Sequence, residues 1–392
     1  MSAAFDVVDH SILLKKLKIY GFQDCSIAWL TSYLNNRNQQ VYIDGKLSSP
    51  LNLDAGVPQG SILGPLLYTL FTNDLPEAIH NHAELNENQS KEASFQTNCK
   101  DCGGICCYAD DTTFTKSDSN PDLIKNEIKI KYDNLTEYMN SNKLILNSDK
   151  THLLIMTSSK MHRNHENFGI TLDTGSEIIK PQDHEILLGG IISSNLKWIE
   201  HIRDHKKSMM NQVTSRINAL SKIAKISSFK TRKMIANGIV LSKLIYIIQI
   251  WGGTSEFLLS LLQKLQNKAA RLVTKLGWYT PVSELLKQCG WLNIKQLVVY
   301  HDLIFIFKVK RDKKPDYFHN KFSKEFVHKT RFSTNNRIKY GQNIESELGK
   351  QNFAYKATLH WNSLPPNLRQ CPKLSKFKKD LKAWIKKEIP IT

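Results

Sequence analysis

The stretch CCYADDTTF, residues 106–114, places two aspartates side by side after a short apolar run and before a run of Thr and Phe. This pattern predicts a β-hairpin with Asp110 and Asp111 at its tip. Aspartate is common at such tips because its side chain accepts hydrogen bonds within the turn. Clustered carboxylates are also the ligands that Mg²⁺ prefers. The stretch alone therefore permits two interpretations, a structural turn or a metal site.

Two other segments favour the metal site. Upstream, GVPQGSILGP (residues 56–65) predicts a tight turn with exposed backbone amides that leads into a helix. Downstream, LNSDKTHLL (residues 146–154) predicts two short strands around a turn that carries Lys150. Paired carboxylates, an amide-lined turn and a lysine together suit phosphoryl transfer, in which metal ions hold the attacking and leaving oxygens.

Length and composition describe a globular protein. With 392 residues, the chain is long enough for two or three domains with their own cores. Its content of 41% hydrophobic and 23% charged residues is that of a globular protein. No apolar run reaches the roughly 18 residues that a transmembrane helix needs, and the first residues lack the pattern of a signal peptide. Seven cysteines in so long a chain do not indicate a disulfide framework. We therefore expect an intracellular protein, cytoplasmic or nuclear, that is not secreted.

Charge is distributed unevenly along the chain. Residues 201–392 contain 37 Lys and Arg against 11 Asp and Glu, a net charge of +26, whereas residues 1–200 carry −8. This asymmetry suits a metal-dependent centre joined to a surface that binds a polyanion. The alternative is a basic half that only keeps the protein soluble.

The basic half contains two amphipathic segments. In residues 256–276, Lys264, Lys268, Arg271 and Lys275 recur at helical spacing beside an apolar face. Such a stripe can follow a phosphate backbone, although a solvated helix face has the same pattern. Residues 375–388 repeat the pattern, and that helix could alternatively lie on a membrane surface.

The cysteines near the aspartate pair suggest zinc only weakly. Cys99 and Cys102 form one CxxC pair, which is half of a zinc site, and the spacing of the nearby histidines fits no standard arrangement. Cys106 and Cys107 have a simpler interpretation as small apolar residues of a buried strand. We therefore do not expect zinc at Cys99 and Cys102.

Taken together, the motifs resemble the reverse transcriptases of non-LTR retrotransposons, the LINE-like jockey group. The resemblance extends over essentially the whole chain and rests on several segments in the family's order. They are AFDVVDH (4–10), GVPQGS (56–61), YADD (108–111), LNSDKT (146–151), LLGGIISSNLKW (187–198), IQIWGG (248–253), LQNKAARLVT (265–274) and WNSLPPNLR (361–369).

The resemblance implies an RNA-directed DNA polymerase that uses Mg²⁺ or Mn²⁺, an RNA template and a DNA primer. It makes Asp110 and Asp111 the metal ligands and Lys150 the group that neutralises or protonates the leaving pyrophosphate. The other implied roles are an aromatic gate at Phe5, a template–nucleotide pocket at Pro58, Gln59 and Gly60, a primer-end contact at Tyr108, a primer grip at Leu188, Gly189 and Gly190, and backbone contacts at Lys264, Lys268, Arg271 and Lys275.

The implied fold is α+β: a right-hand polymerase palm, with an antiparallel sheet and packed helices, over residues 1–200. An inserted loop is expected at about 77–100, and residues 201–392 form a mostly α-helical thumb and C-terminal region. The family's first catalytic aspartate lies five residues before Phe5, which is upstream of Met1, as are the fingers. Asp6 and Asp9 cannot replace it, because an extended strand carries them roughly 20 Å or more away.

We therefore expect the 392-residue chain to have little or no polymerase activity alone, since it lacks the third carboxylate and the fingers. A non-catalytic, nucleic-acid-binding remnant is the alternative function. The sequence leaves the oligomeric state open.

Overall fold

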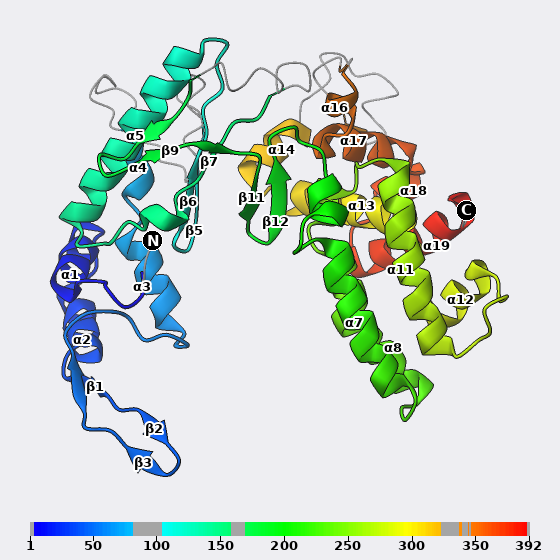
Figure 1. Ribbon diagram of the computed structural model, residues 1–392, viewed down its shortest axis with the longest axis horizontal. Helices are drawn as coiled ribbons and strands as arrows, with labels where there is room; N and C mark the ends of the chain where they lie inside the picture. Colours follow the sequence, from blue (N-terminus) through cyan, green and yellow to red (C-terminus); the bar gives the residue numbers. More distant parts are fainter. Residues whose placement is uncertain are drawn as a thin grey trace. The chain divides into compact units, whose positions relative to one another are not determined.

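The computed structural model describes residues 4–80, 104–157, 169–322, 337–338, 344 and 346–389. They form two compact units (Figure 1). The first contains the described residues up to Ile155 and those from 169 to Gln182, and the second contains 156–157 and the described residues from Asp183 onward. The division therefore comes earlier than residue 200, where we placed it from the sequence, and the predicted primer-grip hairpin belongs to the second unit.

Five helices form the core of the described part of the first unit. They are α1 (His10–Ile19), α2 (Asp24–Leu34), α3 (Leu63–Phe71), α4 (Leu75–His80) and α5 (Pro121–Ser141). Their apolar faces meet in one core, which contains Leu13, Leu34, Leu67, Phe71 and Met139. Burial of these side chains explains why short helices are stable here, since isolated helices of this length are marginal in water.

The strands of the first unit are short and pair in twos. The pairs are β1 (Arg37–Gln39) with β4 (Leu51–Leu53), β2 (Tyr42–Ile43) with β3 (Lys46–Leu47), β5 (Ile105–Tyr108) with β6 (Asp111–Phe114), β7 (Leu153–Leu154) with β10 (Pro181–Gln182), and β8 (Leu172–Asp173) with β9 (Ile178–Ile179). All are antiparallel except β7 with β10. In Figure 1 the hairpin β5–β6 lies beside α4.

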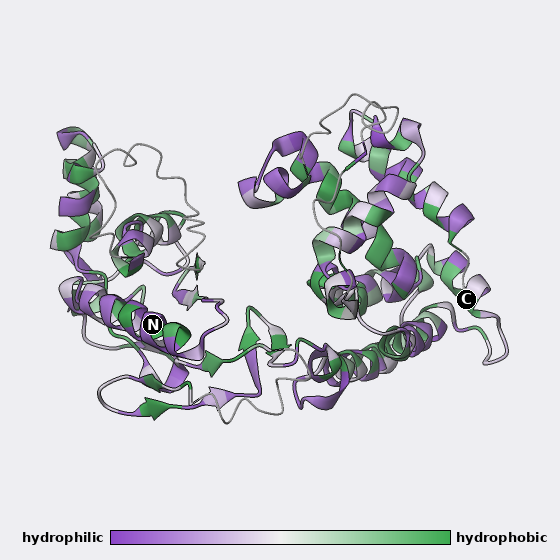
Figure 2. Ribbon diagram, turned by 90° about the horizontal axis from the view of Figure 1, so that it is seen from above, coloured by the Kyte–Doolittle hydropathy of each residue, from purple (hydrophilic) through white to green (hydrophobic). Residues whose placement is uncertain are grey.

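The second unit is a hairpin followed by helices. The hairpin consists of β11 (His184–Leu187) and β12 (Gly190–Ser193). The main helices are α7 (Met209–Ala224), α8 (Phe229–Ala236), α11 (Glu256–Thr274), α12 (Val282–Cys289), α13 (Ile294–Asp312), α17 (Phe353–Ser363) and α19 (Leu374–Glu388). Many of these helices have one hydrophobic and one hydrophilic side, seen as green and purple on the same ribbon in Figure 2. Two cores result, one around Trp251 and Leu262 and one around Trp361 and Phe377.

A mixed helix and strand fold is confirmed, but several details differ from the prediction. Within the described ranges each sheet has only two strands, so the antiparallel sheet expected for a palm is replaced by separate strand pairs. Residues 77–80, expected in a loop, complete helix α4, and the rest of the expected insertion, residues 81–100, lies outside the described residues. Residues 143–146 are not a strand, since they pass directly from α5 into a 3₁₀ turn at Ser148–Lys150. None of the described helices has the length and apolar character needed to cross a bilayer.

Candidate functional site

The aspartate pair lies at the tip of β5–β6, as the sequence predicts. Tyr108 and Asp111 are the last paired residues, so Ala109 and Asp110 form the turn. Ala109 has φ +52°, a left-handed conformation that costs a non-glycine residue roughly 1 kcal/mol. The Asp110 side chain is half-buried, whereas Asp111 is exposed. Neighbouring carboxylates therefore occupy different environments.

Tyr68 of α3 connects this hairpin to the core. Its side chain is 1% exposed, and burial, followed by the nearby negative charge of Asp110, raises the pKa of Tyr68 far above its usual value. The ring of Phe5 packs on the ring of Tyr68, with centroids 4.7 Å apart. Residues 5, 68 and 110, far apart in the sequence, thus meet at one place. Sequence reasoning missed Tyr68, although its spacing from Gly64, Leu67 and Phe71 is that of a buried helix face.

Backbone hydrogen bonds hold the turn at residues 56–60 against the N-terminal segment. The Gly56 N–H donates to the Val8 carbonyl (2.8 Å), and the Val57 N–H donates to the Phe5 carbonyl (2.7 Å). Gly56 has φ +88°, and a Cβ there would lie 2.8 Å from the Asp6 carbonyl oxygen, so only glycine fits. This contact fixes the position of Phe5 relative to the turn.

The same turn is tied to the start of α3. Ser61 Oγ donates to the Pro58 carbonyl (2.8 Å) and accepts from the Gly64 N–H (2.9 Å). Gln59 and Gly60 remain exposed, and the Gln59 amide donates to the Asp6 carboxylate at 2.7 Å. The predicted turn leading into a helix is therefore confirmed, but the backbone amides of Gly56, Val57 and Ser61 donate to carbonyls, so these amides are not exposed as expected.

Asp9 has a structural role instead of a place beside Asp110. Its carboxylate accepts from the Ile12 N–H at 2.9 Å, which caps α1, and pairs with Lys143 Nζ at 2.7 Å. The hydrogen bond from Lys143, followed by that from Ser11, holds the pKa of Asp9 well below its usual value. Within the described part of the chain, no group of three or more His, Cys, Asp or Glu side chains could hold a metal ion.

The donors at the hairpin tip suit a hard divalent cation. Asp110 and Asp111 offer only carboxylate oxygens, which are the ligands that Mg²⁺ and Mn²⁺ take. Cys99 and Cys102 lie outside the described residues. Cys106 and Cys107 are exposed, so our expectation that they lie on a buried strand is wrong. The base of the hairpin packs on the core, while these residues lie nearer its projecting tip.

Two further predicted residues are exposed to solvent. Tyr108 is 64% exposed on β5. Lys150 ends the 3₁₀ turn at Ser148–Lys150, where its N–H donates to the Asn147 side chain at 3.1 Å and its own side chain is exposed. The roles assigned to both residues stay predictions.

Comparison with known proteins agrees with this geometry. Residues 1–187 match the family model for reverse transcriptase (RNA-dependent DNA polymerase). The chain is 27% identical over 278 residues to a probable RNA-directed DNA polymerase from transposon X-element of Drosophila melanogaster, covering 70% of this chain and 28% of the relative. It is 29% identical over 286 residues to the RNA-directed DNA polymerase from mobile element jockey of Drosophila funebris, with the same two coverages.

The matched segment, residues 1–187, belongs to the reverse transcriptase family. Its relatives place it with the non-LTR, LINE-like elements of the jockey group. The chain spans about 28% of the length of the X-element and jockey relatives.

The hairpin at the predicted primer grip is in the second unit. Leu188 and Gly189 form its turn with φ +47° and +77°. The Tyr246 hydroxyl donates to the Leu188 carbonyl at 2.6 Å. A Cβ at Gly190 would lie 2.7 Å from the Ile247 side chain, so the close packing of the hairpin on this segment needs glycine. The hairpin prediction is confirmed, and its role in gripping a primer stays a prediction.

The basic stripe predicted for residues 264–275 is shorter than expected. Lys264 and Lys268 are exposed on α11. Arg271 is half-buried, because its guanidinium lies 4.7 Å from the centroid of the Trp278 ring. Lys275 is exposed but caps the helix with φ +58°, so it does not continue the helical face. Spacing alone could not show that the chain reverses here and returns over Arg271.

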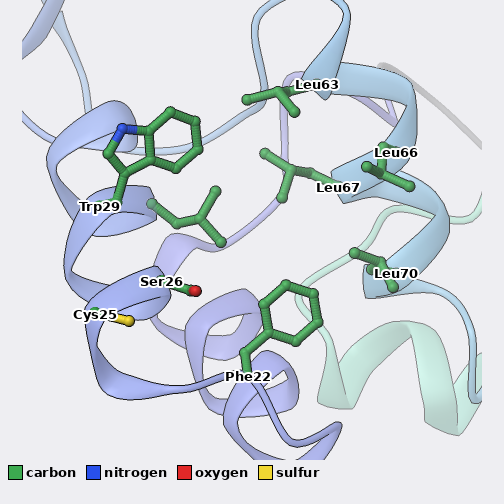
Figure 3. Close-up of a pocket in the computed structure, with 9 residues that line it drawn as sticks. Phe22, Cys25, Ser26, Trp29, Leu63, Leu66, Leu67 and Leu70 are labelled. Atoms are coloured by element: carbon green, nitrogen blue, oxygen red, sulfur yellow. The ribbon is translucent and has the colours of Figure 1, made fainter.

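An apolar pocket of about 380 Å³ lies between α2 and α3. Figure 3 shows Phe22 and Trp29 facing Leu63, Leu66 and Leu70 of α3 across it. Its lining contains no carboxylate, so this pocket is not a metal site. Leu66 is 53% exposed at this pocket.

Proposed function

We propose that this chain carries the polymerase centre of an RNA-directed DNA polymerase, which extends a DNA primer on an RNA template. The observation that supports it most is the meeting of Phe5, Tyr68 and Asp110. The segments of two separate family motifs, around Phe5 and Asp110, come together on Tyr68 of α3 through the ring contact at 4.7 Å and the charge of Asp110 beside the Tyr68 phenol. A hairpin that served only as a turn would not need this arrangement.

In this proposal Asp110 and Asp111 hold Mg²⁺ or Mn²⁺. When bound, the ion neutralises charge on phosphate oxygens. Asp110 is the more demanding ligand, because its carboxylate lies half-buried against the core while Asp111 faces solvent. Tyr68, like any tyrosine, is protonated at neutral pH and so presents a neutral neighbour to the Asp110 carboxylate, and burial, which raises its pKa, keeps it protonated to higher pH.

The surrounding residues orient the substrates. Phe5 is fixed by its ring contact with Tyr68 and by the bond from its carbonyl to the turn, so it can exclude a ribose 2′-hydroxyl as a rigid gate. Pro58, Gln59 and Gly60 line the template–nucleotide pocket, and exposed Tyr108 contacts the primer end.

Lys150 carries an exposed ammonium group, which suits neutralisation of the leaving pyrophosphate. Residues 188–190 grip the primer strand. Lys264 and Lys268, with Lys275 beyond the helix end, contact the nucleic-acid backbone. Arg271 contributes less than the spacing suggested, because the Trp278 segment already engages its guanidinium.

Primer extension with Asp110→Asn tests this function. The purified chain is given an RNA template, a DNA primer and Mg²⁺ or Mn²⁺, and Mn²⁺ binding is followed in parallel by electron paramagnetic resonance. We expect Asp110→Asn to weaken Mn²⁺ binding and to abolish extension. Asp44→Asn is a matched control, because Asp44 is also a hairpin-tip aspartate, exposed at the turn between β2 and β3. Equal Mn²⁺ binding by both variants would contradict the proposed metal site.

A second candidate function is nucleic-acid binding without catalysis. It is favoured by the +26 charge of residues 201–392, and the described residues offer no third carboxylate beside the pair. Tight binding of a primer–template duplex without extension under either metal would support this alternative. Extension that depends on Asp110 would exclude it.

A further inference from the structure

Two large aromatic side chains stand in solvent at one end of the second unit. Trp278 is 77% exposed and Tyr279 is 97% exposed, in the segment between α11 and α12. Aromatic rings bury a large apolar area when they are covered, so leaving two adjacent rings uncovered forgoes that stabilisation. Neither residue belongs to the polymerase centre proposed above.

The Trp278 ring is held in place without a ligand. The Arg271 guanidinium lies 4.7 Å from the ring centroid, and Arg271 also donates to the Trp278 carbonyl at 3.3 Å. A hydrogen bond from the Thr280 N–H to the Gly277 carbonyl (3.1 Å) closes the turn that carries both rings. A ring ordered in advance loses little side-chain entropy when a partner binds.

Exposed cations lie at the end of α11, beside the segment that carries the rings, and on the neighbouring turn between α7 and α8. Lys275 Nζ donates to the Lys225 carbonyl at 3.5 Å, which joins the end of α11 to the turn between α7 and α8. Figure 1 shows these two helix ends at the same end of the unit. Lys222, Lys225, Lys230 and Lys275 are all exposed. No Asp or Glu occurs in residues 205–255 or 257–283, so these segments carry no negative side chain to offset the lysines.

We propose that this surface, defined as Trp278, Tyr279, Lys222, Lys225, Lys230 and Lys275, binds single-stranded nucleic acid. Unpaired bases stack on the two rings, and the lysines contact the backbone phosphates. Rings and cations side by side are the arrangement by which proteins bind single strands without sequence preference. Binding here does not depend on polymerase activity.

The aromatic rings favour a single strand over a duplex. In a duplex each base is covered on both faces by its neighbours, so an exposed ring finds no free base face. Lysines alone attract both forms, because both carry the same backbone phosphates. The two contributions can therefore be separated, since removing the rings affects single strands and removing the cations affects both.

The test compares ring and cation variants of the full chain by fluorescence anisotropy. The probes are an unpaired oligonucleotide of about ten nucleotides and a hairpin duplex with the same number of phosphates. We expect Trp278→Ala/Tyr279→Ala to weaken single-strand binding about five-fold or more, with duplex binding and the salt slope unchanged. Trp278→Phe/Tyr279→Phe restores affinity, because phenyl rings still stack. Lys222→Gln/Lys225→Gln/Lys275→Gln flattens the salt dependence for both probes.

Tyr42→Ala is the matched control, since Tyr42 is 68% exposed in the first unit, where the described structure places no guanidinium on its ring. It leaves single-strand affinity unchanged. Tryptophan emission gives a second readout: the oligonucleotide quenches part of it, and Trp278→Phe removes that part. The proposal is overturned if the double alanine variant binds single strands as tightly as the wild type. It is equally overturned if both probes weaken together, or if anionic lipid vesicles bind while the oligonucleotide does not.

Discussion

Replacing Asp9 separates a structural carboxylate from the proposed metal-binding carboxylates of the first unit. Asp9 lies close in sequence to Phe5 but caps α1 and pairs with Lys143, whereas Asp110 lies at the hairpin tip. We expect Asp9→Ala to lower stability and leave Mn²⁺ binding unchanged. We expect Asp110→Asn to weaken Mn²⁺ binding and leave stability unchanged, because the Asp110 side chain caps no helix.

The structure sets the size of the Asp9 effect. Loss of an aspartate cap costs roughly 0.5–2 kcal/mol. The pair with Lys143 adds only about 0.2–1 kcal/mol, because the Lys143 side chain is 67% exposed and its charge is screened by solvent. Asp9→Ala should therefore cost about 2 kcal/mol, or roughly 4–8 °C in the melting temperature of a unit of this size. Asp9→Asn should cost less than about 1 kcal/mol, because asparagine caps a helix nearly as well.

The pH dependence has a definite sign. The folded pKa of Asp9 is lowered, so its contribution is complete above the unfolded value of 3.8 and is lost as the pH falls below it. The stability difference between wild type and Asp9→Ala should be constant from about pH 5 to 8 and should shrink below about pH 4.

Scanning calorimetry measures these differences. The two units can unfold separately, so Leu13→Ala, which removes a fully buried side chain of the first unit, identifies that unit's transition. A loss of Mn²⁺ binding in Asp9→Ala with an unchanged melting temperature would refute the assignment of Asp9 as a cap. An equal loss of stability in the alanine and asparagine variants would refute the estimate for the cap.

Two other changes test the packing of each unit. Gly64→Ala places a Cβ 2.5 Å from the Pro58 carbonyl oxygen, so we expect it to lower the free energy of unfolding by about 1–3 kcal/mol, measured by calorimetry. Gly238→Ala is the control, because the added Cβ meets open space and stability should change little. Equal effects of the two substitutions would contradict the clash at Gly64. Asp302→Ala leaves Lys356 without its buried partner, and should cost about 3 kcal/mol in urea unfolding of the second unit. Adding Lys356→Met should recover part of that loss, and no recovery would mean that the pair is not coupled.

The sequence by itself determined the local elements. The pair Asp44-Gly45 is typical of a two-residue hairpin turn, because such turns need positive φ at both residues. Both residues have positive φ in the β2–β3 turn, of 48° and 81°. The hairpin around Asp110 follows from residues adjacent in the chain, as does the start of α3 after the turn at Pro58. Such features depend on neighbouring residues alone, so short patterns specify them. The family motifs also come from these segments, which is why the family resemblance could be recognised before the fold was known.

Tertiary packing decided which side chains meet and which remain exposed. No pattern in residues 4–10 shows that Phe5 packs on Tyr68, or that Asp9 finds Lys143 in the loop after α5. Helical spacing predicted Arg271 as a free cation, but the chain reversal at Lys275 brings a tryptophan onto it. Periodicity reports the face of a helix, whereas its exposure depends on what segments distant in sequence place against that face. The surface around the exposed rings includes such a long-range contact, between Lys275 and Lys225, and for that reason only the folded structure reveals it.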